Sequence, residues 1–322
     1  MITSNRGVAL LMVLWIMTVL MVIVLSFSFM TRTDARSTLF FKEGTEKGLL
    51  AEAGIQRGIM EIMHRGLYKN KQAVMEGSEA IKVDGTIYTG QLGNDYYTFD
   101  VVDESGKINL NILTDSSGII LNKLLINMGV SKEDADTIVD SILDWKDTDE
   151  LHRLHGAESD YYMSLPNPYK SKNARLDAVE ELLMVKGITP EILYGSNEKA
   201  GLFDLLTVYA RTGGINVNAA PKEVLAALPG MTPELANKVS SLRESAEMKT
   251  LEDLGSIVGM SLPLMSPYVG VSESNTYTIK ATGYKKNEKQ GFTIMATVVI
   301  ESNSKYRCVY YKSPAGARQR QE

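Results

Sequence analysis

The residues best suited to chemistry in this chain are acidic and lie between positions 133 and 160. Ten carboxylates occur there against two cationic side chains, Lys146 and Arg153. So many like charges in a short stretch are unfavourable unless solvent or a bound cation screens them. Calcium takes six to eight oxygen ligands in flexible geometry, which suits such a segment. The spacing is not that of an EF-hand loop, but it predicts a calcium site with six candidate ligands: Asp144, Asp147, Asp149, Glu150, Glu158 and Asp160.

Other side chains of this segment have simpler interpretations. His152 and His155 suggest zinc, because imidazole is a zinc ligand, but neither their spacing nor a nearby thiolate supports that ion. We expect both to be surface histidines. In the run Asp160-Tyr161-Tyr162, we expect the two tyrosine rings to be buried and to anchor the segment. The earlier carboxylates are interpreted as the solvated face of a helix: Glu133, Asp134, Asp136 and Asp140.

A membrane-spanning helix is predicted at the amino terminus. Residues 8–30 carry no charge, and at about 1.5 Å per residue they reach roughly 34 Å, enough to cross a hydrocarbon core of about 30 Å. A secretory signal is cleaved after its apolar stretch, whereas the candidate processing point here, Gly7-Val8, precedes it. Cleavage after Gly7 would remove a short leader and keep the helix. A simple single-pass anchor is the alternative, because hydropathy alone does not separate the two.

The segments that follow predict a long helix packed on an antiparallel sheet. Residues 32–63 contain no proline, and Ala51, Ile55, Ile59 and Ile62 recur at helical spacing. Four glycines in this helix predict close packing against the sheet or, because glycine costs helix stability, fraying near the first of them: Gly44, Gly48, Gly54 and Gly58. Alternating patterns predict five strands, at 86–92, 95–102, 276–284, 292–300 and 305–311. The sheet is therefore split in the sequence.

The residues between the two groups of strands are helical in pattern and repetitive. Residues 106–111, Gly-Lys-Ile-Asn-Leu-Asn, recur as Gly-Gly-Ile-Asn-Val-Asn at 213–218. Two turn signals follow each copy, at 128–133 and 186–191 and at 229–234 and 258–261. In each, a glycine can end one helix in a left-handed conformation and Ser or Thr can cap the next. We expect a duplicated four-helix unit of the helix-hairpin-helix type, with Asn218 or Thr114 as caps.

Charge and motifs argue against two other classes of protein. The formal net charge is −5, and the second glycine of a DNA-binding Gly-x-Gly hairpin is Ser or Thr in all four turns. Near the third turn, Lys238 and Arg243 are balanced by Glu234 and Glu244. These observations disfavour the first alternative, a DNA-binding competence-type protein. A membrane-anchored periplasmic hydrolase is another, although the common catalytic motifs are absent from the sequence. Cys308 is the only cysteine, so no intramolecular disulfide forms.

The amino-terminal junction resembles that of type IV pilins and pseudopilins. Their leader peptidase cleaves after a glycine, as at Arg6-Gly7 followed by Val8, and methylates the new amino terminus. Most of these proteins carry Glu at the fifth mature position, where this chain has Met12. That departure, the split sheet, the duplicated insert and segments 144–150, 156–162, 168–173 and 216–221 resemble the minor pseudopilin K family of type II secretion. The resemblance covers nearly the whole chain.

The resemblance implies an α+β fold. An amino-terminal transmembrane helix continues into a pilin-like helix on an antiparallel sheet, and a large all-α domain of duplicated helix-hairpin-helix (SAM-like) units is inserted. The expected divisions are a leader at 1–7, the transmembrane helix at 8–30, a first pilin-like part at 31–112, the insert at 113–269 and a second pilin-like part at 270–322.

The resemblance also implies a function without catalysis. Members stand at the tip of the pseudopilus, where Met12 in place of Glu lets this chain lack a neighbour above it, because a buried charge needs a partner. The implied partners are the minor pseudopilins I and J, inner-membrane lipid and the prepilin leader peptidase, with no nucleic acid. The chain is expected to cross the inner membrane once, with its carboxyl-terminal body in the periplasm. Calcium in the acidic segment is also a family property.

Overall fold

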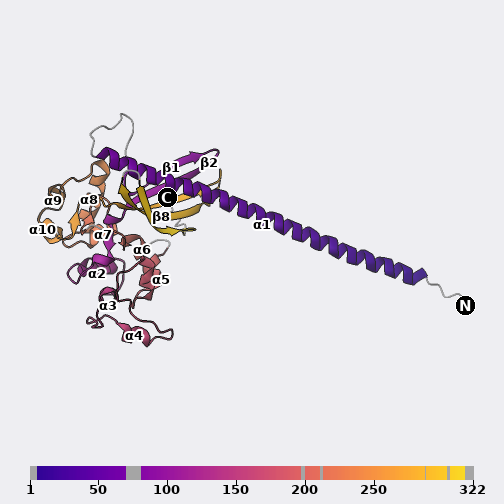
Figure 1. Ribbon diagram of the computed structural model, residues 1–322, viewed down its shortest axis with the longest axis horizontal. Coiled ribbons are helices and arrows are strands. Elements are labelled where there is room, and N and C mark those ends of the chain that lie inside the picture. The colour runs from indigo at the N-terminus through magenta and orange to yellow at the C-terminus, as the bar shows by residue number, and fades with distance from the viewer. Residues whose placement is uncertain are drawn as a thin grey trace.

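A computed structural model of the chain describes residues 6–69, 81–196, 200–210, 213–286, 288–302 and 305–315. It has a mixed α+β body from which one very long helix projects (Figure 1). Met1 to Asn5 of the expected leader lie outside the described residues.

The projecting helix, α1 (Arg6–Lys69), is continuous over 64 residues. Its side chains from residue 8 to residue 43 are all exposed. The apolar stretch has a mean hydropathy of 3.0 over its most apolar 18-residue window, and none of that window is buried, so α1 is long and apolar enough to cross a membrane. Of the two expected outcomes for the glycines, fraying near Gly44 does not occur, and the helix continues past residue 63 to Lys69.

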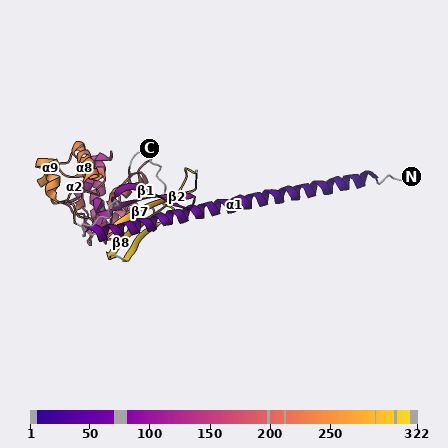
Figure 2. The same ribbon diagram turned by 90° about the horizontal axis from the view of Figure 1, so that it is seen from above.

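The carboxyl-terminal part of α1 lies across a five-stranded sheet with the order β1-β2-β7-β8-β9, in which all neighbours are antiparallel. Figure 2 shows the helix running over the strands. The strands are β1 (Asp84–Leu92), β2 (Asp95–Asp103), β7 (Thr276–Tyr284), β8 (Phe292–Ser302) and β9 (Lys305–Lys312). The five predicted strands are therefore present, each within two residues of its expected ends.

Two of the four helix glycines let α1 approach this sheet closely. A Cβ atom at Gly54 would lie 2.8 Å from Ala281 Cβ, and one at Gly58 would lie 2.8 Å from Ile279 Cγ2. These distances are shorter than van der Waals contact, so only glycine fits without a shift. The neighbouring helix residues Ala51, Ile55, Ile59 and Ile62 are buried in the core beneath, as their spacing predicted.

The chain leaves the sheet after β2 and returns before β7, and the residues between form a second core. The helices there are α2 (Gly118–Asn127), α3 (Lys132–Lys146), α4 (Ser159–Met163), α5 (Pro190–Tyr194), α6 (Leu202–Leu205), α7 (Lys222–Ala227), α8 (Pro233–Ser245), α9 (Leu251–Val258) and α10 (Leu262–Met265), with 3-10 turns η1 (Glu104–Gly106), η2 (Leu110–Ile112), η3 (Val179–Met184) and η4 (Gly259–Ser261). Ile108 and Leu110, which the expected boundary assigned to the pilin-like part, pack in this second core.

The insert consists of two units with the same backbone pattern. Each is closed by a pair of parallel two-residue strands: β3 (Ile108–Asn109) beside β4 (Leu206–Thr207), and β5 (Ile215–Asn216) beside β6 (Val269–Gly270). The expectation of an all-α insert is wrong in this respect, because the repeated Ile-Asn pairs are short strands.

Equivalent asparagines brace the two units. The Asn111 side chain accepts from Leu176 N and donates to the carbonyls of Leu176 and Val208. The Asn218 side chain accepts from Met248 N and donates to the carbonyls of Met248 and Val271. Asn218 therefore caps no helix, and Thr114 precedes Ser117, the residue before α2. The expectation that these two residues are caps is wrong.

The predicted turns have the expected backbone geometry. Gly129, Gly187, Gly230 and Gly259 all adopt positive φ angles, between 58° and 96°. The hydroxyls of Ser131, Thr189 and Thr232 then accept from backbone amides of α3, α5 and α8. Ser261 in the fourth turn makes no side-chain cap.

Buried polar contacts fix the insert to the pilin-like part. Asp103, fully buried at the end of β2, accepts from both the amide and the hydroxyl of Ser105 and of Ser274, and from the Asn216 side chain. Ser105 lies where the chain leaves the sheet, and Ser274 lies where it returns. Arg65 of α1 adds ion pairs to Glu247 of the insert and to Glu273.

Candidate functional site

The acidic segment is organised by helix α3 and the loop that follows it. The Ser131 hydroxyl caps α3, and the helix ends at Lys146, so that Asp144 lies in its last turn. Asp144 has no exposed surface. Its oxygens accept from Arg153 of the loop, at 2.6 Å from the guanidinium Nη1 and 3.1 Å from the backbone amide. A helix end and a loop thus meet at one carboxylate.

Three of the predicted ligands are brought together here. Ligand oxygens of Asp144, Asp147 and Glu158 all lie within 4.8 Å of one another. Arg153 also donates to Asp147 at 2.8 Å, and its Nε donates to Asp115 at the same distance. One guanidinium therefore serves three carboxylates, and the cluster keeps a net negative charge.

Several oxygens around this cluster lack a partner among the described protein atoms. They are both carboxylate oxygens of Glu158, one oxygen of Asp147 and the side-chain oxygen of Asn173. Glu158 is only 1 % exposed. Burial raises the pKa of its carboxyl to about 7, and the nearby Asp144 and Asp147 carboxylates raise it too. Buried carboxylate oxygens without donors need a cation or a proton. An oxygen-only donor set of this kind fits calcium.

The other predicted ligands lie around the cluster but not within it. The Asp149 carboxylate accepts from Leu151 N, and that of Asp160 accepts from Tyr161 N. The Glu150 carboxylate accepts from the Ser159 hydroxyl and from the Asn173 side chain. The structure thus separates a central trio from a peripheral trio of the six candidates. Whether either trio holds a metal stays a prediction.

Sequence reasoning missed two residues of this site. Asn173 lies far along the loop, and its backbone has a positive φ of 50° while its amide donates to the carbonyl of Trp145. Gly156 has no room for a side chain, because a Cβ atom there would overlap Asp144 Oδ2. The signal for Gly156 was a glycine inside the acidic segment, but only the folded loop shows what it faces.

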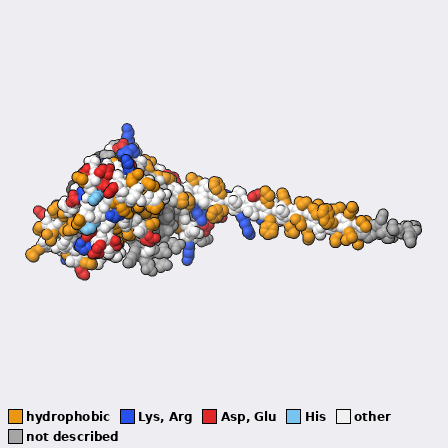
Figure 3. All heavy atoms as spheres, turned by 90° about the horizontal axis from the view of Figure 1, so that it is seen from below, with side chains coloured by type: hydrophobic (Ala, Val, Ile, Leu, Met, Phe, Trp, Pro, Cys, Tyr) orange, Lys and Arg blue, Asp and Glu red, His pale blue; other side chains and the backbone are white. Residues whose placement is uncertain are grey.

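His152 and His155 are exposed as expected, whereas of the two tyrosines expected to be buried only Tyr162 is, and Tyr161 is half-buried. The His155 ring lies 3.3 Å from Asp140 and not among the clustered carboxylates. Tyr162 is fully buried, edge-on to Trp145 at 5.1 Å and stacked on Tyr169 at 5.3 Å. These rings anchor the loop onto α3. In Figure 3, which looks at the side where α4 lies in Figure 1, red acidic and pale-blue histidine side chains occupy the same face.

The predicted processing point lies in the first turn of α1. Gly7 and Val8 are helical, and Val8 is exposed. The described helix therefore runs through the expected junction.

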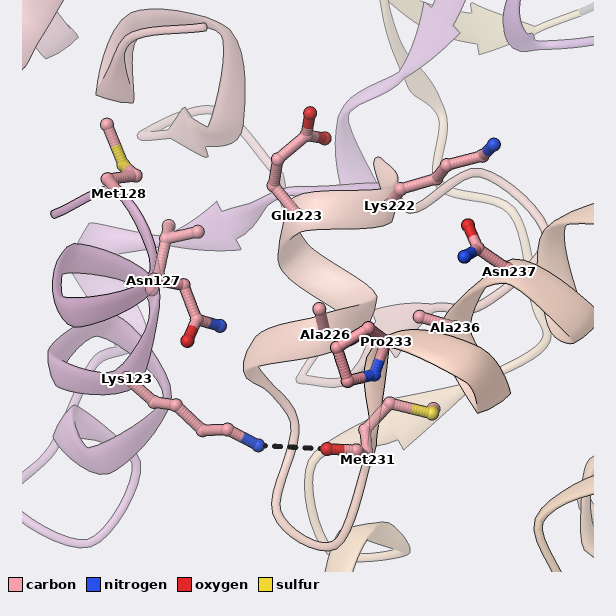
Figure 4. Close-up of a pocket in the computed structure, with 11 residues that line it drawn as sticks. Lys123, Asn127, Met128, Lys222, Glu223, Ala226, Met231, Pro233, Ala236 and Asn237 are labelled. Carbon is pink, nitrogen blue, oxygen red and sulfur yellow. Dashed lines mark hydrogen bonds between the residues drawn. The ribbon is translucent and has the colours of Figure 1, made fainter. Parts of the chain in front are cut away.

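A separate groove of about 440 Å³ lies between α2, α7 and α8 (Figure 4). Its apolar lining includes Leu124, Ala226 and Ala236. Lys123 reaches across it and donates to the carbonyls of Leu228 and Met231, and burial lowers the pKa of this lysine. Its ammonium is therefore used to join the two units.

The third turn, where DNA binding would need cations, uses one of them internally. Arg243 of α8 donates to the carbonyls of Val217 and Ala220. A guanidinium bound in this way does not extend toward a phosphate backbone.

The comparisons with known proteins agree on one family. Models described as type II secretion system (T2SS), protein K match residues 106–195 and 215–272, which correspond to the two units of the insert. The putative type II secretion system protein K of Escherichia coli K12 is 36% identical over 111 residues, and that of Pectobacterium carotovorum is 32% identical over 117 residues. These alignments span about a third of each relative, 34% of its length. The Klebsiella pneumoniae protein K is 28% identical over 256 residues, 71% of each chain.

A solved structure has a similar fold. One chain of the GspK-GspI-GspJ complex from the type 2 secretion system of enterotoxigenic Escherichia coli matches with a TM-score of 0.60. The match covers 88% of this chain and 100% of that chain, at 15% identity.

Proposed function

Because the chain belongs to the protein K family of the type II secretion system, we propose that it is the minor pseudopilin at the tip of the pseudopilus and that it initiates pseudopilus assembly. The observation that carries this proposal is the division of α1. Its first part is apolar and wholly exposed, and its second part is packed on the sheet. The first part of the helix can therefore insert into a membrane or pack in a bundle of helices, while the second part belongs to the folded body.

The insert supports a position at the end of an assembly. Figure 1 shows it beside the sheet at the end of the molecule remote from the amino terminus. The Asp103 and Arg65 contacts join the insert to the pilin-like part, which supports a role for it in blocking a further subunit above. Met12 supports the same position, because it offers no carboxylate to the amino terminus of a neighbour.

The partners in this proposal are the minor pseudopilins I and J. The chain of similar fold comes from a complex with proteins of those names. Residues 31–322 are suited to a binding test in solution, because no side chain in residues 8–43 is buried and both cores stay intact without the apolar stretch. We expect this fragment to co-purify with the soluble parts of I and J from the same system as a ternary complex. Separate elution of all three proteins contradicts the proposal.

Maturation is proposed to occur at Gly7-Val8, by the prepilin leader peptidase and in the inner membrane, with the body in the periplasm. Gly7→Leu should leave an uncleaved precursor and abolish secretion, whereas Gly44→Ala, in an open stretch of α1, should be processed normally. Mass spectrometry of the mature chain checks this directly. A mature chain that begins at Met1 or beyond Met30 contradicts the proposal.

The central carboxylates are proposed to hold calcium. Asp144, Asp147, Glu158 and Asn173 would supply the inner oxygens, with Asp149, Glu150 and Asp160 around them. A bound ion would neutralise the buried negative charge and tie the loop to the end of α3. Calorimetric titration of residues 31–322 with calcium should give saturable heat that Asp147→Ala removes and Glu133→Gln, on the exposed face of α3, retains. Absence of heat from the intact fragment contradicts the metal site.

The two units of the insert are proposed to be helix-hairpin-helix units with a structural use. All four turns have the left-handed glycine of such hairpins and three of them have the hydroxyl cap, while Arg243 is bonded within the fold. A gel-shift assay at low salt, where the backbone contribution is strongest, should show no retained duplex DNA.

A further inference from the structure

Two leucines on the acidic loop are exposed to an unusual degree. Leu151 is 80% exposed and Leu154 is 89% exposed. Single exposed leucines are ordinary on protein surfaces. Here two large aliphatic side chains lie three residues apart on one loop, and neither contributes to the core beneath.

The loop that carries them is held in a defined conformation. Between the leucines, Arg153 points inward and bonds to Asp144, Asp147 and Asp115. The amide of Leu151 donates to Asp149, and the carbonyl of Asp149 accepts from Asn173. The loop therefore holds the leucines in a defined conformation, so little conformational entropy of the loop is lost when a partner binds them.

The charge of this loop restricts the partner. Residues 147–160 contain five carboxylates, at 147, 149, 150, 158 and 160, one arginine, Arg153, and two histidines, His152 and His155, which count as neutral at pH 7. That guanidinium is consumed by its internal ion pairs. Three of the five carboxylates, Asp149, Glu150 and Asp160, are exposed, so the apolar pair is flanked in sequence by accessible negative charge, which attracts a cationic surface and repels an anionic one.

A lipid surface fits these observations poorly. Bacterial bilayers with anionic headgroups would meet the loop with like charge. The apolar stretch that could enter a bilayer ends near Met30, and the 39 helical residues from there to Lys69 extend about 58 Å. Figure 1 shows α3 and α4 on the side of the insert away from α1, so the loop is remote from that membrane.

We propose that Leu151 and Leu154 form a docking surface for a partner protein that presents a basic amphipathic segment, with apolar side chains covering the leucines and Lys or Arg side chains meeting the carboxylates. This inference goes beyond the tip function, because it assigns the loop a protein contact that neither the membrane helix nor the calcium site requires.

The test uses residues 31–322 both in EGTA and in calcium, so that a failure of the docking surface can be told apart from an effect of the calcium site. Three fluorescent peptides serve as probes: an amphipathic helix of leucine and lysine, the same helix with glutamate in place of lysine, and the same helix with serine in place of leucine. Fluorescence anisotropy should show that the Leu/Lys peptide binds about tenfold or more tightly than the other two. The double substitution Leu151→Ser and Leu154→Ser should weaken that binding by about tenfold or more.

The matched control is Met260→Ser, because Met260 is 94% exposed in the fourth turn of the insert. It should leave binding within about twofold of the unchanged chain. Neither variant removes a buried side chain, and an unchanged urea midpoint verifies this. Equal binding by the double variant overturns the docking surface, and equal binding of the Ser/Lys peptide reduces it to ion pairing. Leucine-dependent sedimentation with phosphatidylglycerol vesicles overturns the assignment to a protein partner.

Discussion

Replacing Glu158 with glutamine should stabilise the cation-free protein and destroy its response to calcium. The Glu158 carboxylate is buried, and neither oxygen accepts a well-formed hydrogen bond from the described residues, although the nearby Ser171 hydroxyl partly opposes the rise in its pKa. Burial raises its pKa from 4.5 to about 7. The difference between 7 and 4.5 is 2.5, which at about 1.4 kcal/mol per pKa unit corresponds to about 3 kcal/mol. The folded protein loses this stability at a pH at which Glu158 is ionised in both the folded and the unfolded protein.

The sign follows from proton linkage. Between pH 4.5 and 7 the folded protein holds the Glu158 proton more tightly than the unfolded chain does, so stability in EGTA falls as pH rises through this window. Glutamine is neutral at every pH. Glu158→Gln should therefore raise the free energy of unfolding by about 3 kcal/mol at pH 8 and leave it nearly unchanged at pH 4.

Calcium should reduce the difference in stability between the two proteins. An ion that binds only the folded state at 100 times its dissociation constant stabilises the native chain by about 2.7 kcal/mol. The glutamine variant has lost a charged ligand, so calcium should stabilise it far less. In calcium at pH 8 the advantage of the variant should therefore largely disappear.

Residues 31–322 provide a direct assay for this prediction. The chain has two tryptophans, and the fragment lacks Trp15 and keeps Trp145. Trp145 is buried against Tyr162, which anchors the loop, so its fluorescence during urea unfolding reports on the site. Glu133→Gln on the exposed face of α3 is the control, and its free energy of unfolding should stay within about 0.5 kcal/mol of the unchanged fragment. Equal stability of the Glu158 variant and the unchanged fragment in EGTA at pH 8, or an undiminished calcium response in the variant, refutes the reasoning.

Three further predictions concern glycines and the buried junction. Gly156→Ala should weaken calcium binding about tenfold or more in calorimetry, because the added Cβ atom displaces the Asp144 carboxylate; affinity equal to that of the unchanged chain contradicts this. Gly58→Ala should lower the free energy of unfolding by about 1–3 kcal/mol through overpacking against Ile279, whereas Gly44→Ala, with open space around it, should raise it by about 0.5–1 kcal/mol. Asp103→Ala should cost more than about 3 kcal/mol in urea unfolding, because buried donors from Ser105, Ser274 and Asn216 lose their acceptor; a loss below about 1 kcal/mol would show that the junction is not held there.

The parts of the fold that sequence predicted are those with a strict local period. Ile55, Ile59 and Ile62 recur every three or four residues, and only one face of α1 meets the sheet, so the periodic residues are the buried ones. The strand patterns have the same property, because alternate residues of β7 and β8, such as Ile279, Ala281 and Ile294, belong to the same core as the buried face of α1. Glycines at turns were predictable for a related reason, since positive φ angles select that residue.

The site was less predictable because it is assembled by tertiary contacts. Sequence distance gave no reason to prefer Glu158 over Asp149 as a central residue. The conformation of the loop decides which carboxylates are central, and the rings of Tyr162 and Tyr169 hold that loop against Trp145. The sequence identified Arg153 only as one of two cations in the acidic segment and did not predict that its three ion pairs organise the cluster. The bracing roles of Asn111 and Asn218 depend equally on partners distant in sequence.

Comparison of the two units explains where the acidic site comes from. In the second unit, α8 ends at Ser245 and Met248 bonds to the bracing Asn218, so two residues, 246–247, connect them. In the first unit, α3 ends at Lys146 and Leu176 bonds to Asn111, so 29 residues, 147–175, occupy the same position. Asp147, Arg153, Gly156, Glu158 and Asn173 all lie in this added segment, while Asp144 lies on the helix from which it leaves.

Both units share the same frame of helices braced by an asparagine, and the unit with the short connection has this frame without an acidic loop that could hold a metal. In the other unit, the long connection has little core of its own and depends on the rings and charges at its base. A cation at that base would then stabilise the added loop and the leucines that it displays, without being needed for the frame that both units share.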